Sequence, residues 1–399
     1  MVNYASIVPL IGGETIAMQN VLGKRPEYIL SYEGFENNDK HLLEYYKNEV
    51  PYYLIKGDKL PITNSVDVIN TVCPCAGLSS LNVSSSSESA TNDWMRISAE
   101  HVLGTIKPKV FWGENAPRLA SKMGEPVVKD LRQIGKKHGY TFSIFKTKSL
   151  LHGLSQVRDR AFYFFWKGEK VPVFEYIKRE HETIEDTIRS VKQDSHDPMN
   201  VVTNKNVPSQ DPYYRYVLEE IEGGITHSAF QDKITKSYDV KDYIEDSGIT
   251  YDKVSKWMLK HGFEKQSQRC ITMYEKLKSG GNIMRRGVNV PKGHIGAFVG
   301  HYPTMLTHPD EDRFLTIREC LSIMKLPEDF ILQGGVKNLN HICQNVPVTT
   351  AQDMATEVVK FVEGRSDNRL VETNYLVQDN KNNSWWSEQS SVQLDDFMV

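Results

Sequence analysis

The sequence predicts an α/β fold built around a mostly parallel sheet and interrupted by a smaller inserted domain. Over residues 1–170, short apolar runs alternate with amphipathic stretches, which is the pattern of strand–helix units. From about residue 170 to 305, acidic helical patterning, a polar stretch and a Gly-rich basic end replace that rhythm. With 39% apolar and 25% charged residues, the composition is that of a globular protein, so disorder and collagen-like repeats are excluded.

The first part of the chain carries most of the expected strands. They are expected at residues 4–10, 28–32, 52–55, 66–72, 109–112, 140–145 and 161–166. A crossover helix is expected over 126–137, because apolar residues recur there at helical spacing. Pro126 suits the first turn of that helix and Gly139 suits its end.

The last part of the chain carries two expected helices and a tail. Thr316 and Glu319 have the spacing of a capping box, so a helix should begin there, and residues 349–362 should form another. The polar, acidic chain after Asn374 is expected to be loose. The expected division is a discontinuous first domain, an inserted domain and a tail, over residues 1–170 with 310–375, 171–309, and 376–399.

The sequence also limits where the protein acts. No apolar run approaches the ~20 residues that a membrane helix needs. The start of the chain lacks a cationic stretch ahead of an apolar one, so no signal peptide is expected. The five cysteines, an odd count without disulfide spacing, favour a reducing compartment. We therefore expect a cytoplasmic protein with no membrane partner.

The net charge of -3 argues against a generally basic nucleic-acid binder, but the charge is unevenly distributed. Residues 101–150 carry 10 basic and 3 acidic side chains, and residues 251–300 carry the same numbers. Residues 171–250, between them, carry 9 basic and 16 acidic side chains. The two basic segments are either solvated helix faces or surfaces for an anionic partner.

Cys75 follows the expected strand 66–72, in the run Cys-Pro-Cys-Ala-Gly-Leu-Ser-Ser. In open α/β sheets, ligands bind outside the carboxyl ends of the strands, so Cys75 stands where a reacting group is expected. The alternative is a small buried residue in a tight turn. The spacing of Cys73 and Cys75 is too close for the usual zinc pair, so no metal is expected.

Two other expected strands have candidate site residues at one end. Glu114 follows strand 109–112, and a polar segment precedes strand 161–166. A carboxylate at the end of a buried strand can have a raised pKa and donate a proton near neutral pH, although Glu114 could also be an N-cap or a surface acid. Before strand 161–166, the side chains of Gln156, Arg158 and Arg160 would point to one side of an extended segment. They could bind a planar polar substrate or a phosphate, or form a solvated charged edge.

In order along the chain, these segments resemble the cytosine-5 DNA methyltransferase family. The motifs are Pro-Cys-Ala-Gly-Leu-Ser-Ser, Glu-Asn-Ala after a strand, and Gln-Val-Arg-Asp-Arg before a strand. Two later segments, 315–330 and 342–352, are similar to the family's "LTxRECxRLQGFPDDF" and "IGNxVPxxxA". The resemblance covers about 1–170 and 310–362, and the uncovered middle is where the family keeps its variable target-recognition domain. It implies a Rossmann-like methyltransferase domain and an inserted target-recognition domain.

The sequence departs from the family pattern near the cofactor and base pockets. In the first loop, the family's Asp, Phe and first Gly fall on Ser6, Val8 and Leu10. Ala76 and Leu78 replace Gln and Phe, Ala116 replaces Val, and Cys343-Gln344 replaces Gly-Asn. These changes concern the shape of the pockets and leave the expected reacting groups in place.

The resemblance implies a covalent mechanism on a flipped-out cytosine of double-stranded DNA. Cys75 would add as thiolate to carbon-6, Glu114 would bind ring nitrogen-3, and Arg158 and Arg160 would hold the base carbonyl and its surroundings, with Gln156 beside them. Methyl would then pass from S-adenosylmethionine to carbon-5. A nearby guanidinium such as that of Arg158 favours the thiolate.

The resemblance also implies residues for the cofactor and for DNA. The cofactor would be bound by residues of the first loop, two acids and later pocket residues, namely Ile11, Gly12, Gly13, Glu33, Asp58, Pro74, Gln344 and Val346. DNA would be contacted by Ser79, Arg285 and Arg286, the last two reading guanine edges or phosphates. The Ser-rich stretch 84–90 has the composition of a lid that closes over DNA, or is a plain surface loop.

Other readings of the sequence stay open. One is a catalytically silent, DNA-binding or regulatory paralogue, which the altered first loop permits. Another is an RNA cytosine methyltransferase, although the Cys-Phe-Thr signature of the transfer-RNA enzymes is absent. The pocket could also take a modified cofactor or a modified cytosine. We expect a monomer in a bacterial cell or a phage-infected host, with its membership of a restriction-modification system left open.

Overall fold

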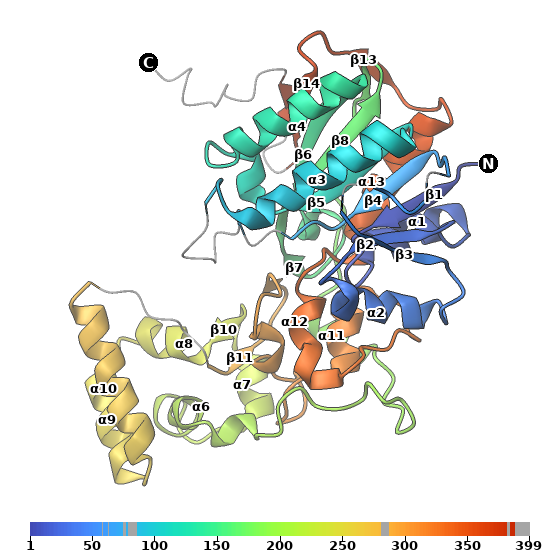
Figure 1. The fold of residues 1–399 in the computed structure, drawn as a ribbon. Coiled ribbons are helices and arrows are strands. Elements are labelled where there is room, and N and C mark those ends of the chain that lie inside the picture. The colour runs from blue at the N-terminus through green and yellow to red at the C-terminus, as the bar shows by residue number, and fades with distance from the viewer. Residues whose placement is uncertain are drawn as a thin grey trace, which may run out of the picture. The chain divides into compact units, whose positions relative to one another are not determined.

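The computed structural model divides into two compact units (Figure 1). It describes residues 1–57, 59–62, 64–74, 77–78, 86–280, 287–380 and 384–387. Unit 1 contains Met1–His181, Met324–Gly334 and Asn340–Val399, and unit 2 contains Glu182–Ile323 and Gly335–Leu339. The expected sites at Asp58, Cys75, Ser79, Arg285 and Arg286 lie outside the described residues.

Unit 1 is built on a nine-stranded sheet, in the order β15-β14-β6-β8-β5-β4-β1-β2-β3. The strands are β1 (Tyr4–Ile7), β2 (Ile29–Tyr32), β3 (Tyr52–Ile55), β4 (Val68–Thr71), β5 (Val110–Asn115), β6 (Tyr140–Lys148), β8 (Asp159–Lys167), β14 (Tyr375–Asp379) and β15 (Ser384–Ser387). Neighbours pair in parallel from β3 to β5 and between β6 and β14, whereas β8 is antiparallel to β5 and β6. This mostly parallel sheet confirms the predicted fold class.

Helices cover both faces of the sheet. The helices of unit 1 include α1 (Gly13–Leu22), α2 (Glu36–Tyr45), α3 (Asp93–His101), α4 (Glu125–His138) and α13 (Val348–Val362). Phe165 and Trp166 are consecutive in β8 and therefore point to opposite faces. Gly135 of α4 lies against Phe165, and Phe361 of α13 packs on Trp166, so α4 and α13 cover opposite faces. α1 packs against α13, and α3 against α4.

The order of the strands creates a switch point between β1 and β4. The chain runs from β1 to β2 and β3 on one side, then returns to place β4 on the other side of β1. Loops after strands on the two sides of such a point diverge and leave a crevice where ligands bind. The loop after β1 and the segment 72–74 after β4 both start at this point. The topology thus places two of the predicted site segments side by side.

Unit 2 contains short helices around its own apolar core, which includes Tyr214, Phe230 and Trp257. Its elements include α5 (Ile184–Arg189), α6 (Pro212–Tyr216), α7 (His227–Lys233), α8 (Val240–Asp246), α9 (Tyr251–Lys260), α10 (Glu264–Lys278), α11 (Ile317–Ile323), β10 (Tyr238–Asp239), β11 (Asn289–Val290) and β12 (Ile295–Gly296). β10 pairs with β11 in an antiparallel ladder. The helical patterning expected for the middle of the chain is confirmed.

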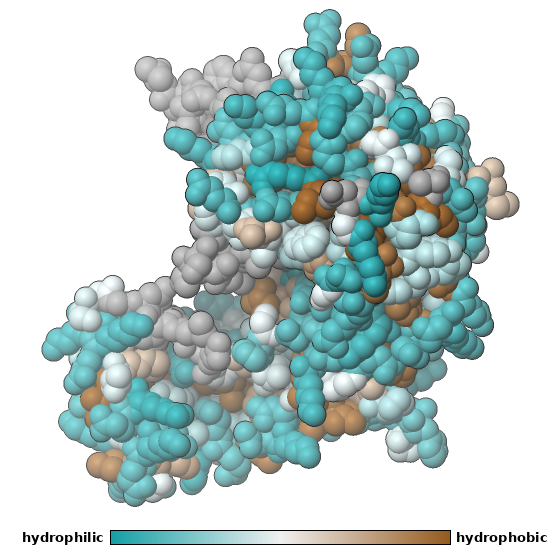
Figure 2. Space-filling view, in the orientation of Figure 1, coloured by the Kyte–Doolittle hydropathy of each residue, from teal (hydrophilic) through white to brown (hydrophobic). Residues whose placement is uncertain are grey.

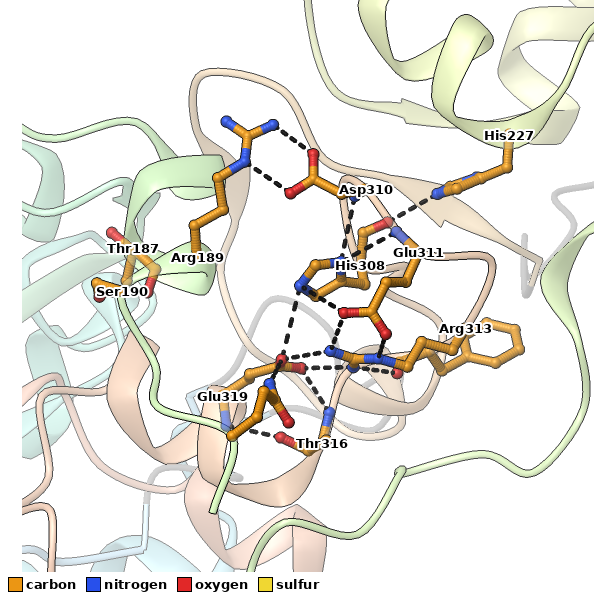
Figure 3. A network of polar contacts seen from close by, with 12 residues as sticks. Thr187, Arg189, Ser190, His227, His308, Asp310, Glu311, Arg313, Thr316 and Glu319 are labelled. Atoms are coloured by element: carbon orange, nitrogen blue, oxygen red, sulfur yellow. Dashed lines mark hydrogen bonds and ion pairs between the residues drawn. The ribbon is translucent and has the colours of Figure 1, made fainter. Parts of the chain in front are cut away.

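The capping box predicted at Thr316 is present and joins a larger polar network (Figure 3). The Glu319 amide donates to Thr316 Oγ1 over 3.2 Å, and the Thr316 amide donates to Glu319 Oε2 over 2.7 Å. The fully buried Glu319 also accepts from Arg313 over 2.8 Å. This segment was expected in the first domain. It belongs to unit 2 because α11 packs on α5 and the chain before it pairs with Thr203.

Several expected element boundaries differ from the structure; β4 is shorter, β6 and β8 are longer, and three further differences have an evident cause. β1 ends at Ile7 rather than residue 10, because Val8 and Leu10 adopt left-handed φ angles of 49° and 51°. β5 continues through Asn115, because it pairs with β8 along its whole length. The tail after Asn374 is not loose at its start, since β14 pairs with β6 and buries Tyr375.

On the face drawn in Figure 2, hydrophobic residues stand singly or in small groups among hydrophilic ones. The exposed large hydrophobic side chains come from elements far apart in the sequence, and they are Met1, Ile97, Met123, Val201, Val207, Leu259, Val336 and Leu370. Across the residues described here, no helix is long and apolar enough to cross a membrane.

Candidate active site

The loop between β1 and α1 forms the first part of the site. Gly12 has a φ of 92° and is the residue before the first turn of α1. A Cβ on Gly12 would lie 2.5 Å from Leu42 Cδ1, so both the backbone angle and the packing require glycine there. A Cβ on Gly13 would lie 3.1 Å from the Val346 carbonyl oxygen. The expected cofactor residues Gly12, Gly13 and Val346 are therefore brought together.

Glu14 follows these glycines and is fully buried in the first turn of α1. Its Oε2 accepts a hydrogen bond of 2.8 Å from Asn345 Nδ2. Burial raises its pKa to about 8, and the nearby charge of Glu114 acts in the same direction. Among the described residues, Glu14 Oε1 and Asn345 Oδ1 have no hydrogen-bond partner. A ligand can supply partners for both oxygens, by accepting from Glu14 when this side chain holds its proton and by donating to Asn345.

Glu33 and Gln344 lie on the other expected cofactor segments. Glu33 follows β2 directly, is exposed, and has an oxygen 3.6 Å from Lys56 Nζ. The Gln344 side-chain oxygen accepts a hydrogen bond from Asn38 of α2. Pro74, after β4, is half-buried, and Ile11 is buried in the loop before α1. Glu33 is thus placed at a strand end, where acids bind ribose hydroxyls in nucleotide sites.

Glu114 is buried at the carboxyl end of β5, which excludes the surface-acid alternative. Arg160 Nε lies 2.9 Å from Glu114 Oε2. Burial raises the pKa of Glu114, while the positive charges of Arg160 and Arg158 oppose that rise. The sequence predicted a raised pKa for Glu114. A buried carboxyl between these opposing effects can hold a proton or accept a hydrogen bond near neutral pH.

Arg158 and Gln156 are fully buried, so they do not form a solvated edge. Arg158 donates from its Nη2 to the Cys343 carbonyl oxygen over 2.6 Å. The Gln156 amide nitrogen lies 3.5 Å from Met324 Sδ. The contact with Cys343 ties Arg158 to the segment that carries Gln344 and Val346. Glu114 and the two arginines, expected from two separate motifs, therefore lie together, and Arg158 also contacts the backbone of a third segment.

The end of β4 carries Cys73, which is buried. Its Sγ lies 3.5 Å from Thr71 Oγ1 and 4.0 Å from Ser98 Oγ. Burial raises the pKa of this thiol, and a buried thiol of raised pKa is a poor nucleophile. The predicted nucleophile Cys75 lies two residues further on, outside the described residues.

Three residues of the site were not predicted from the sequence. Glu14 reads as an ordinary first-turn acid, and Asn345 lies beside the expected Gln344 without a signal of its own. Asp39 of α2 is buried and accepts a hydrogen bond from the Leu10 amide, which no local pattern indicates. Among the residues with a described position, no group of three or more His, Cys, Asp or Glu side chains could hold a metal ion.

Comparison with known proteins relates this chain to one family. The model of the C-5 cytosine-specific DNA methylase family matches residues 5–360. A Methanocaldococcus jannaschii protein inferred to be a type II methyltransferase is 32% identical over 111 residues. That match covers 25% of this chain and 35% of the relative, so it spans about a third of the relative's length.

Solved structures share the fold. One is an Escherichia coli protein that is encoded within a prophage and inferred to be a DNA modification methyltransferase. It superposes with a TM-score of 0.57 at 12% identity, covering 91% of this chain and 100% of that one. The S. pombe Dnmt2 methyltransferase gives a TM-score of 0.50 at 10% identity, covering 90% and 99%. At these identities the likeness concerns the fold alone.

Proposed function

Because the chain belongs to the C-5 cytosine-specific DNA methylase family, we propose that it methylates carbon-5 of cytosine in double-stranded DNA. The observation that carries this proposal is the buried cluster at the end of β5. There, Glu114 has Arg160 Nε at 2.9 Å and the charge of Arg158 nearby. An acid and two guanidinium groups can bind the ring nitrogen and the carbonyl of a cytosine together.

S-adenosylmethionine is the proposed cofactor, and it supplies the methyl group. The residues at the switch point fit such a group. Gly12 and Gly13 let the loop pack closely against Leu42 and the Val346 carbonyl, and Glu33 stands at the end of β2. Glu14 Oε1 and Asn345 Oδ1 have no hydrogen-bond partner among the described residues, which suits a polar ligand that supplies one to each. Ile11, Asp58, Pro74, Gln344 and Val346 complete the proposed cofactor site.

The reaction we propose uses covalent catalysis, because carbon-5 of cytosine is a poor nucleophile. The Cys75 thiolate adds to carbon-6, and Glu114 hydrogen-bonds or protonates ring nitrogen-3 as electron density moves toward it. Arg158 and Arg160 hold the base carbonyl, and the buried Gln156 supports this edge. After carbon-5 has been methylated it loses its proton, and the carbon–sulfur bond to Cys75 breaks.

DNA must present the cytosine outside the helix, because a base inside a duplex cannot reach a buried carboxyl such as Glu114. We propose that residues 171–309 act as a target-recognition domain, with Arg285 and Arg286 contacting guanine edges or phosphates. Ser79 and the stretch 84–90 would contact or cover the DNA near Cys75. The protein would act in the cytoplasm, where its DNA lies, and without a membrane partner.

The first experiment measures activity and target sequence together. The chain is expressed in a host that lacks cytosine methylation, and carbon-5 marks are mapped by bisulfite sequencing. Marks at one short sequence support the proposal. Absence of marks, with folded protein that binds S-adenosylhomocysteine, would instead favour the silent DNA-binding reading.

The second experiment tests the nucleophile. Wild-type protein, Cys75→Ser and Cys73→Ser are incubated with S-adenosylmethionine and duplex DNA containing 5-fluorocytosine, which stops the reaction at the covalent stage. Wild type and Cys73→Ser should form an adduct that survives denaturing electrophoresis, and Cys75→Ser should not. An adduct retained by Cys75→Ser would assign the covalent step to another residue.

A further inference from the structure

The loop after β1 has an unusual backbone. Val8 and Leu10 have φ angles of 49° and 51°, in the left-handed region that favours glycine. Both side chains are buried, and Val8 is β-branched. Such angles persist only where the surroundings hold them in place. This loop therefore needs an external support, and the support is expected to contact its backbone.

Asp39 of α2 supplies such a contact. Its Oδ1 accepts a hydrogen bond of 3.1 Å from the Leu10 amide. Its Oδ2 accepts one of 3.0 Å from the Tyr52 hydroxyl of β3, which fixes the direction of the carboxyl group. Asp39 is fully buried, and burial raises its pKa to about 7. Burying a carboxyl group costs free energy unless hydrogen bonds offset that cost. The hydrogen bond from the Leu10 amide is one of those that offset it here.

The same face of α2 holds two further parts of the proposed cofactor site. Leu42 Cδ1 lies 2.5 Å from the place of a Cβ on Gly12. Asn38 donates to the Gln344 side-chain oxygen. Three residues within five positions of one helix thus contact the first loop and the segment that carries Gln344. α2 is a platform on which both segments rest.

We propose that Asp39 is a positioning residue, which holds Leu10 in its left-handed conformation and thereby keeps the loop 8–12 in a shape that binds the cofactor. A glycine in place of Leu10 would adopt this left-handed conformation without strain. With leucine at this position, the hydrogen bond to Asp39 stabilises it instead. This inference rests on the proposed function for the identity of the ligand. The coupling between Asp39 and Leu10 exists in the ligand-free protein and is independent of it.

The experiment combines changes at both positions. The variants are Asp39→Ala, Asp39→Asn, Leu10→Gly and the double variant Leu10→Gly/Asp39→Ala. Glu44→Ala, at an exposed position of the same helix, is the matched control. Binding of S-adenosylhomocysteine is measured by calorimetry, unfolding of the ligand-free protein by urea, and KM and kcat by methyl transfer.

Asp39→Ala should weaken S-adenosylhomocysteine binding about tenfold or more, because the loop loses the hydrogen bond that holds Leu10 at its left-handed φ angle. KM for the cofactor should rise while kcat changes less than about threefold. Asp39→Asn keeps an acceptor oxygen and should stay within about threefold of wild type. In the Leu10→Gly background, the fold-loss of affinity caused by Asp39→Ala should be at most about a third of the fold-loss in the wild-type background. The reason is that glycine needs no support at this φ angle.

Equal losses from Asp39→Ala in the wild-type and Leu10→Gly backgrounds would overturn the proposal, because Asp39 would then act without holding Leu10. Wild-type affinity in Asp39→Ala would overturn it as well. If Asp39→Ala does not fold, the double variant decides: folding restored by Leu10→Gly supports the proposal, and failure to fold in both backgrounds would overturn it. Should wild type not bind S-adenosylhomocysteine at all, the proposed function fails, and the unfolding measurements still report whether Asp39 and Leu10 are coupled.

Discussion

Glu14 and Asn345, 331 positions apart in the chain, are joined by a hydrogen bond of 2.8 Å between Asn345 Nδ2 and Glu14 Oε2. The contact links the first turn of α1 to the residues just before α13. Because Glu14 is fully buried, its protonation state matters for the stability of the fold. Glu14 is also close enough to Glu114 for the charge of Glu114 to raise its pKa.

Replacing Glu14 by Gln should change how stability depends on pH. The pKa of Glu14 is raised to about 8 in the folded protein, from 4.5 without the fold. Between these values the folded state holds a proton that the unfolded state lacks, so wild-type stability falls as pH rises through that window. Glu14→Gln keeps an acceptor for Asn345 and removes this slope. Urea unfolding from pH 5 to 8.5 checks it, and parallel curves for the two proteins would contradict it.

Replacing Glu114 by Gln should reduce methyl transfer by about 10²–10⁴-fold, because a group of this kind supplies that share of an acid–base step. Glutamine keeps the size of the side chain and an oxygen that faces Arg160, so folding should be preserved. Turnover of labelled methyl into DNA is the measurement, with unfolding as the control. A loss of less than about threefold would remove Glu114 from the chemistry.

His41 should stay neutral far below the usual range of an imidazole. Its Nδ1 accepts from the Gln333 amide over 3.0 Å, so its Nε2 carries the proton and donates to His341 Nδ1 over 2.7 Å. Burial lowers the pKa of His41 to about 3. The unfolded chain takes up a proton near pH 6.5, so this pair's contribution to stability is present above that value and lost as pH falls toward 3.

Nuclear magnetic resonance of ¹⁵N-labelled histidine checks this, with His41→Asn to assign the signal. A His41 resonance that titrates between pH 6 and 7 in the folded protein would contradict the expectation.

Arg313 should contribute more than Thr316 to the free energy of unfolding, because Arg313 pairs with the buried Glu319. Arg313 donates from Nη2 and Nη1 to the two oxygens of the buried Glu319 over 2.8 and 3.0 Å. Arg313→Met leaves that charge without its main partner and should cost about 3–5 kcal/mol of the free energy of unfolding. Thr316→Ala removes one cap bond and should cost about 1 kcal/mol. Urea unfolding measures both, and equal costs would show that the ion pair adds nothing.

The strands and long helices followed from the sequence because their signals are local. β3, α4 and α13 match the expected ranges within one residue at each end, since apolar periodicity and end signals coincide there. The strand β14 was missed because its burial depends on pairing with β6, more than 200 positions away. Asp39 was missed for a similar reason. It contacts the Leu10 amide, and the left-handed backbone angle of Leu10 cannot be predicted from the residue type.

The charge pattern was only partly informative about surfaces. Within residues 101–150, at least three lysines form ion pairs, Lys109 with Asp67, Lys137 with Glu100, and Lys146 with Asp379. Part of the local excess is therefore balanced by acids from other segments. On α9 and α10, by contrast, Lys253, Lys260, Lys265 and Lys276 are exposed and have no ion-pair partner among the described residues.

If α9 and α10 face DNA, their lysines should set the salt dependence of binding. Removing one lysine–phosphate pair lowers the slope of log K against log salt concentration by about 0.9. The double variant Lys265→Gln/Lys276→Gln should therefore reduce the slope by about 2, with little effect on folding because glutamine is a good helix former. The matched control is Lys167→Gln/Lys170→Gln, two exposed lysines outside both basic segments. Titrations of duplex DNA from 50 to 300 mM salt measure the slope, and equal slopes for the two double variants would mean that α10 does not lie along the DNA.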